Sequence, residues 1–166
     1  MGTVALSLWM VPGSFATGEE GHVRLISEDA LAIVTIAQEA EGEPYIGKVA
    51  VAEVIRNRMN KKYASDGTVS GTVLRPFQFS GWNTKDPGRL RTVRSDTTDS
   101  VIQQCVRAWE EAKAGSDVVH GAVLYYNPSL VTETPDWALP DSATEVAVIG
   151  QHRFFIPKQR NGTVKI

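Results

Sequence analysis

The sequence has little cysteine, no long apolar run and no excess of positive charge. Its 166 residues include a single cysteine, Cys105, so the chain can form neither an internal disulfide nor a cysteine-rich zinc module. No apolar run approaches the roughly 18–20 residues of a membrane-spanning helix, and we expect no membrane partner. An excess of positive charge is missing too: 17 Lys and Arg stand against 19 Asp and Glu, a formal net charge of −2. These numbers argue against a strongly basic nucleic-acid-binding protein.

The length and composition favour one folded unit. Domains commonly hold about 100–150 residues, and 42% hydrophobic residues are enough for one well-buried core. Residues 1–26 hold an apolar run that Pro and Gly interrupt, and we expect a short N-terminal arm there. No Lys or Arg precedes that run, so a signal peptide is not expected. The remainder, residues 27–166, is predicted to form a single domain.

Hydrophobic spacing predicts helices first and a small sheet later. Ser27 is a good helix N-cap, and Gly42 separates two helical patterns. The expected elements are helices over residues 27–40, 44–59 and about 95–115 and strands over residues 122–126 and 145–149. This order indicates the α+β class, mainly helical with a small antiparallel sheet.

The junction of the first two predicted helices holds three closely spaced carboxylates, Glu39, Glu41 and Glu43. Glu39 lies eight residues after Leu31 and so projects from roughly the apolar face, where a carboxylate is costly unless it is paired or protonated. A carboxylic acid that stays protonated can donate the proton that cleaves a glycosidic bond. The alternative is a structural Glu39 bonded to backbone amides of the next helix. Glu41 and Glu43 point elsewhere and are expected to be solvated.

Glu53 lies on the apolar side of the second predicted helix. It is a candidate second carboxylate for a glycosidase that uses two acids. The alternative is an ion pair with Arg56 or Arg58, which we favour because buried charges are usually paired.

Aromatic and amide side chains in the second half of the chain are typical of carbohydrate binding. Aromatic faces pack on pyranose rings, and amides bond the sugar hydroxyls. The candidates for such a groove are Gln78, Trp82, Tyr125, Tyr126, Asn127 and Trp137. Phe77 and Phe79 are instead expected to anchor a long loop in the core.

The histidines are the only material for a zinc site. His22, His120 and His152 have neither HExxH nor closely paired spacing, so no metal and no other cofactor is expected. Cys105 lies in the middle of a predicted helix, on its apolar face, and is expected to be an inert core thiol.

Several short motifs in a fixed order carry a resemblance to a known family. They are residues 37–44, 47–52, 57–58, 69–73, 78–80, 82, 121–122, 125–128, 137 and 149–154. Together they resemble the SleB/CwlJ-type cell wall hydrolases, a family known for spore-cortex lytic enzymes that also occurs in bacteriophage lysins. Each motif alone is weak, but their order and rough spacing are kept over about residues 28–157.

The resemblance implies a lysozyme-like catalytic domain that cleaves the MurNAc–GlcNAc β-1,4 bond of peptidoglycan as a lytic transglycosylase. It places the catalytic acid on Glu39, the first Glu of a Glu-Ala-x-Gly-Glu motif, and adds Ser80 and His152 to the candidate substrate-binding residues. Two positions depart from the family pattern: Glu41 stands where Arg is frequent, and Met59 where some members carry Thr.

Several alternatives stay open on the sequence alone. Attack by water would make the protein a hydrolytic muramidase, and the histidines would suit a zinc amidase. A non-catalytic glycan-binding module of a virion would keep the same fold. In each case we expect a monomer that acts at the bacterial cell wall on peptidoglycan glycan strands, with release from a phage-infected host as one route.

Peptidoglycan is anionic, and the chain is slightly acidic. Binding could depend on a local basic face or on aromatic and amide contacts. The residues available for a basic face are Lys48, Arg56, Arg58, Lys61 and Lys62.

Overall fold

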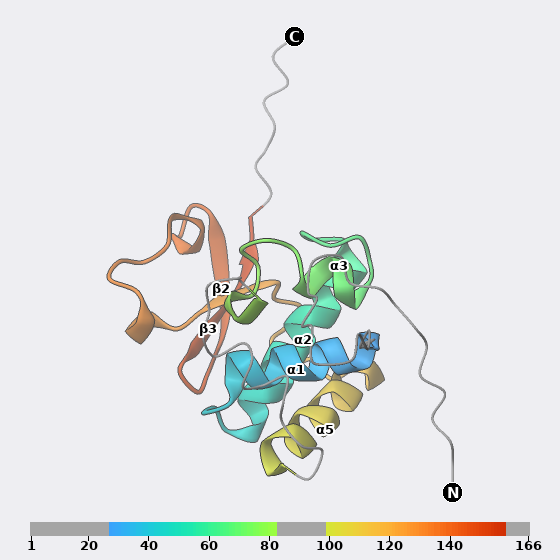
Figure 1. The fold of residues 1–166 in the computed structure, drawn as a ribbon. Helices are drawn as coiled ribbons and strands as arrows, with labels where there is room; N and C mark the ends of the chain where they lie inside the picture. Colours follow the sequence, from blue (N-terminus) through green and yellow to red (C-terminus); the bar gives the residue numbers. More distant parts are fainter. Residues whose placement is uncertain (1–26, 83–98, 159–166) are drawn as a thin grey trace, which may run out of the picture.

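The computed structural model describes residues 27–82 and 99–158, with helices on one side and a small sheet on the other (Figure 1). The elements are α1 (Glu28–Ala40), α2 (Tyr45–Lys61), α3 (Val69–Val73), η1 (Ser80–Trp82), α5 (Ser100–Ala114), β1 (Leu124–Tyr126), η2 (Pro128–Leu130), η3 (Asp136–Ala138), β2 (Ala143–Ile149) and β3 (His152–Pro157). The predicted α+β class, mainly helical with a small antiparallel sheet, is confirmed. The predicted arm over residues 1–26 lies outside the described residues.

The helix ends follow local capping rules. The Ser27 hydroxyl accepts a hydrogen bond from the Ala30 amide and begins α1 as predicted. Asp99 caps α5 in the same way, while the predicted start near residue 95 lies outside the described residues. Gly115 ends α5 with a φ of 102°, in the left-handed region that glycine adopts without steric cost.

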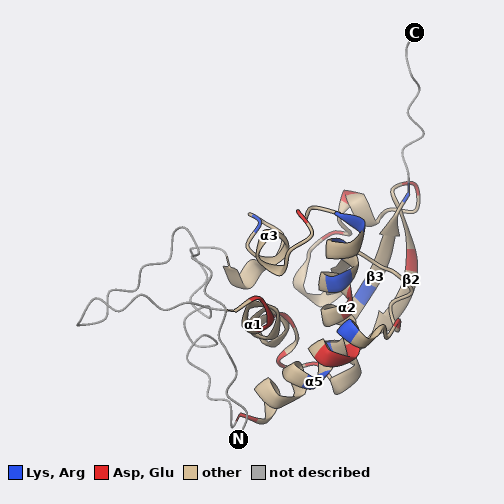
Figure 2. Cartoon of the chain, turned by 90° about the vertical axis from the view of Figure 1, so that its right-hand side faces the viewer, with Lys and Arg blue, Asp and Glu red and all other residues tan. Residues whose placement is uncertain are grey.

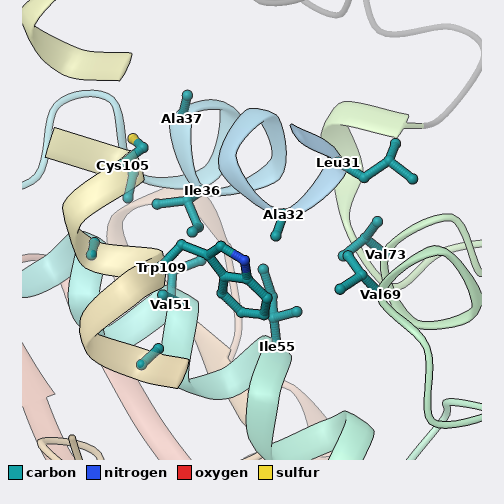
Figure 3. Close-up of a cluster of buried hydrophobic side chains, with 14 of the residues drawn as sticks. Leu31, Ala32, Ile36, Ala37, Val51, Ile55, Val69, Val73, Cys105 and Trp109 are labelled. Atoms are coloured by element: carbon teal, nitrogen blue, oxygen red, sulfur yellow. The ribbon is translucent and has the colours of Figure 1, made fainter. Parts of the chain in front are cut away.

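Helix α2 is the centre of the helical side and is buried on almost every face from residue 47 to residue 58. Helices α1 and α5 pack on it, and Trp109 of α5 lies between Ile36 of α1 and Ile55 of α2 (Figure 3). Cys105 is fully buried in this cluster, and desolvation raises the pKa of its thiol to about 11. The predicted place of Cys105 in the core is confirmed.

The sheet has three antiparallel strands in the order β1-β3-β2. Two of them correspond to the predicted strands, and β3 pairs with both. Tyr125 pairs with Phe154 and Tyr126 with Arg153, so the neighbouring tyrosines of β1 face opposite sides of the sheet.

Within residues 27–82 and 99–158, no helix combines the length and the apolar character that crossing a bilayer requires.

Candidate active site

Two hydroxyl groups hold the carboxyl of Glu39, which lies half-buried in the last turn of α1. The Tyr125 hydroxyl donates to Oε2 at 2.8 Å, and the Ser80 hydroxyl donates to Oε1 at 3.3 Å. The three residues come from α1, β1 and η1. The site therefore lies where the helical side meets the sheet.

Tyr125 is a fixed donor in this arrangement. Burial raises the pKa of its phenol well above the ordinary value, and the neighbouring negative charge of Glu39 raises it further. The phenol thus keeps its proton at neutral pH. Its ring packs against His152, with the ring centroids 5.1 Å apart, and against Phe154.

Arg58 of α2 connects the residue before β1 with the loop that carries Ser80. Its Nε donates to the Val123 carbonyl at 2.7 Å, and its guanidinium donates to the Gln78 side chain at 3.2 Å. The guanidinium also lies over the ring of Phe79, 4.9 Å from the centroid. Burial lowers the pKa of Arg58, but an arginine stays charged near neutral pH. Contacts with Arg58 and Glu39 therefore hold residues 78–80 of the loop in place.

Glu43 is buried, with 8% exposure, so the prediction of a solvated side chain is wrong. Its Oε2 accepts the Gln151 amide at 3.1 Å, and its Oε1 lies 3.6 Å from Nδ1 of His152. Gly150 precedes this contact with a φ of 58°, and a Cβ there would collide with Oε2. Helical spacing misplaces Glu43 because α1 ends at Ala40 and the chain turns before α2.

His152 stands between Glu43 and Tyr125. Burial lowers its pKa, although the charges of Glu43 and Glu39 act in the opposite direction. The imidazole is thus neutral at pH 7 and contributes shape and packing.

Lys48 closes the turn between α1 and α2 from inside. Its buried ammonium group donates to the carbonyl of Glu41 at 3.2 Å and to that of Glu43 at 2.6 Å. These bonds satisfy two carbonyls of the turn that joins α1 to α2. The lysine fixes the end of the helix that carries Glu39.

Glu53 is fully buried in α2, and its partners are backbone amides rather than arginine. Its two oxygens accept from the amides of Val118 and Val119, each at 3.0 Å. Arg56 instead donates to carbonyls at the end of α5, and Arg58 to the site described above. The predicted ion pair is wrong.

The predicted groove residues do not all lie together. Gln78, Ser80, Tyr125 and His152 lie around Glu39, as the contacts above establish. Trp82 packs on the main core, with its indole nitrogen donating to the Thr35 hydroxyl at 2.8 Å.

Tyr126 and Trp137 lie on the face of the sheet opposite to Tyr125. Tyr126 is 8% exposed and packs with Trp137 and Phe155 in a separate aromatic cluster. Asn127 caps η2 through Ser129 and donates to Gln151. The alternation of side chains along β1 separates Tyr126 from Tyr125.

Four of the five cationic residues of α2 and its end donate to backbone carbonyls, namely Lys48, Arg56, Arg58 and Lys61. Lys48 and Arg58 are buried, Arg56 is bonded to carbonyls, and Lys61 donates to the Gly121 carbonyl. Figure 2 shows Lys and Arg along α2 interspersed with acidic segments on neighbouring helices. The basic-face alternative stays a prediction that rests on Lys61 and Lys62, which are exposed at the end of α2.

Metal ligands are not grouped in the part of the chain that the structure describes: no cluster of three or more His, Cys, Asp or Glu is placed to hold an ion there. His120 is exposed, and His22 lies outside the described residues.

Comparison with known families decides the relationship. A family model described as Cell Wall Hydrolase matches residues 42–155. The chain belongs to the cell wall hydrolase family. The resemblance that the sequence motifs indicate is therefore confirmed. Glu39 lies just before the matched range.

Curated members of the family include spore cortex-lytic enzymes. The enzyme of Halalkalibacterium halodurans is 35% identical over 116 residues, which are 70% of this chain and 31% of that protein. The enzyme of Bacillus subtilis is 26% identical over 144 residues, which are 87% of this chain and 39% of that protein. This chain thus spans about a third of the length of these relatives.

Two solved structures of the family share the fold. The catalytic domain of the Bacillus cereus SleB protein has a TM-score of 0.59 at 28% identity, covering 84% of this chain and 98% of that one. The catalytic domain of the Bacillus anthracis germination-specific lytic transglycosylase SleB also has a TM-score of 0.59, at 27% identity, with 84% and 100% coverage.

Proposed function

We propose that this cell wall hydrolase cleaves the glycan strands of peptidoglycan at the MurNAc–GlcNAc bond as a lytic transglycosylase, with Glu39 as the acid and then the base. One observation carries the proposal: the half-buried Glu39 carboxyl has its Oε2 occupied by the Tyr125 hydroxyl, which leaves Oε1 toward the more exposed Ser80. The similarity to the lytic transglycosylase domain supports it.

The reaction needs two proton transfers through one carboxyl group. Protonated Glu39 donates from Oε1 to the glycosidic oxygen as the bond to C1 of MurNAc breaks, and an oxocarbenium-like state forms. The O4 hydroxyl of GlcNAc leaves with that proton. The Glu39 carboxylate then takes the proton from the C6 hydroxyl of MurNAc, whose oxygen attacks C1 and closes a 1,6-anhydro ring.

The Tyr125 hydroxyl occupies one oxygen of the Glu39 carboxyl, at 2.8 Å. The hydrogen bond of Tyr125 also orients the carboxyl, so that the same oxygen faces the leaving group and then the C6 hydroxyl.

A transglycosylase is favoured over a muramidase because Glu43 and Glu53, two candidate carboxylates among the described residues, are engaged by other groups. A hydrolase of the two-carboxylate type uses a second acid to activate water or bind the sugar. Glu53 has both oxygens on backbone amides, and Glu43 is buried against Gln151 and His152. We therefore assign neither to the chemistry.

Mass spectrometry of digested sacculi tests the product. The expected fragments end in 1,6-anhydroMurNAc. Fragments with reducing MurNAc ends would show a muramidase instead, and free stem peptides with intact glycan would show an amidase. Binding to sacculi with no soluble fragment would indicate a glycan-binding module.

Substitution of Glu39 by Gln tests the catalytic group, because it keeps the shape and removes the acid. We expect release of fragments to fall at least 1,000-fold, the order of loss typical for an essential catalytic group. Glu110→Gln is the matched control, since Glu110 lies on α5 in an exposed ion pair with Lys113. Near-full activity of Glu39→Gln would refute the assignment.

A further inference from the structure

The exposed ring and the backbone conformation of Phe77 do not contribute to the stability of the fold. Its side chain is 88% exposed, and its backbone φ is 64°, in the left-handed region. A bulky residue there is a genuine outlier, whereas glycine adopts the region freely. The expectation that Phe77 anchors the loop in the core is wrong, since only Phe79 is buried.

The residues that follow Phe77 are fixed to the site. The Gln78 amide donates to the Arg75 carbonyl at 3.2 Å and closes the turn, and its side chain accepts from Arg58. Phe79 is buried beneath the Arg58 guanidinium. Three residues after Phe77, Ser80 bonds Glu39. The Cα atoms of residues 77 and 80 can thus be at most about 11 Å apart.

A single exposed apolar residue is ordinary on a protein surface. Phe77 differs from such a residue in two respects: its backbone conformation is unfavourable, and its loop is anchored directly to the candidate acid. An aromatic face kept in water beside a glycan-cleaving site has one chemical use that fits the substrate. It can pack on the apolar face of a pyranose ring.

We infer that Phe77 is a binding platform for a sugar ring of the glycan strand close to the bond that Glu39 cleaves. The inference rests on the proposed function for its ligand. It assigns Phe77 to substrate affinity and not to the chemical step.

Binding can be measured apart from cleavage in the Glu39→Gln background, by pelleting the protein with purified sacculi. Adding Phe77→Gly removes the ring and suits the left-handed backbone, so folding is kept. We expect binding to weaken about 3- to 10-fold, while the melting temperature stays or rises. Phe77→Trp keeps an aromatic face and should bind within about 2-fold of the parent.

Val148→Ala is the matched control, since Val148 is an apolar residue that is 63% exposed on the edge strand β2. Val148 lies opposite Arg153 of β3, which forms an ion pair with exposed Glu145. It should leave binding unchanged. In the active protein, Phe77→Gly should raise KM by the same factor as it weakens binding and leave kcat unchanged.

The outcomes separate this inference from the proposed function. Sacculus binding that depends on Phe77, with no fragments released by the unmodified protein, would sustain the platform and refute the transglycosylase. Cleavage with a KM that Phe77→Gly does not change would sustain the transglycosylase and refute the platform. Equal losses in Phe77→Gly and Phe77→Trp, or no binding of the Glu39→Gln protein to sacculi, would overturn the platform.

Discussion

Replacing Glu53 by Gln should destabilise the fold and leave the chemistry intact. The carboxylate is fully buried and accepts two backbone amides at 3.0 Å. Gln keeps one acceptor, so one amide loses a charge-assisted bond and keeps a neutral one. The other amide then faces an NH2 group, and an unsatisfied buried donor costs about 1–3 kcal/mol.

The total expected loss is about 2–4 kcal/mol, since hydrogen bonds to charged groups exceed neutral ones by roughly 1 kcal/mol. In a domain of this size, a loss of about 3 kcal/mol lowers the melting temperature by about 6–12 °C. Thermal and urea unfolding followed by circular dichroism measure this loss.

Glu145→Gln is the control for removing one negative charge. Glu145 is exposed and pairs with Arg153 on the sheet surface, where solvent screens the interaction. Fragment release at a temperature where both variants are folded completes the assay, and both should match the parent protein. A Glu53→Gln variant that is stable but inactive would refute the structural role and restore Glu53 as a second catalytic carboxylate.

Three further expectations follow from the contacts around the site. Tyr125→Phe removes the donor to Glu39 and keeps the ring, so kcat should fall about 10- to 100-fold in a folded protein; an unchanged initial rate would contradict this. Burial lowers the pKa of His152 below its ordinary 6.5, so the unfolded chain binds a proton that the folded chain does not. At pH values below about 6.5, the melting temperature of the parent protein should therefore decrease relative to that of the His152→Asn variant. A difference in melting temperature that stays constant across pH would contradict this expectation. Burial raises the thiol pKa of Cys105 to about 11, so thiol reagents at mild alkaline pH should label only the unfolded protein, as mass spectrometry would show.

Local features were predictable from the sequence because they depend on neighbours along the chain. Ser27 begins α1 and Gly115 ends α5, as the capping rules predict. Glu39 stood out because a carboxylate near an apolar face needs an explanation, and the family motif fell on the same residue. These signals act within one or two helical turns.

The partners of the buried charges were not predictable in the same way. Charged side chains of opposite sign can be read from a sequence, whereas every residue has a backbone amide and carbonyl, so the sequence does not indicate which of them will bind a buried charge. Glu53 therefore looked like a partner of arginine, although amides far along the chain hold it. Phe77 was misjudged for a related reason: residue type suggests burial, but the turn at Gln78 decides where the ring points.

The bond between Glu39 and Tyr125 joins residues 86 positions apart, and this separation affects when the protein can act. Glu39 belongs to the first described helix, while Tyr125 lies on an edge strand held by the last strand, β3. A growing chain thus carries the proposed acid long before it carries the hydroxyl that donates to it. Lytic competence should be acquired late in folding, after β1 pairs with β3, and should disappear together with the sheet on unfolding.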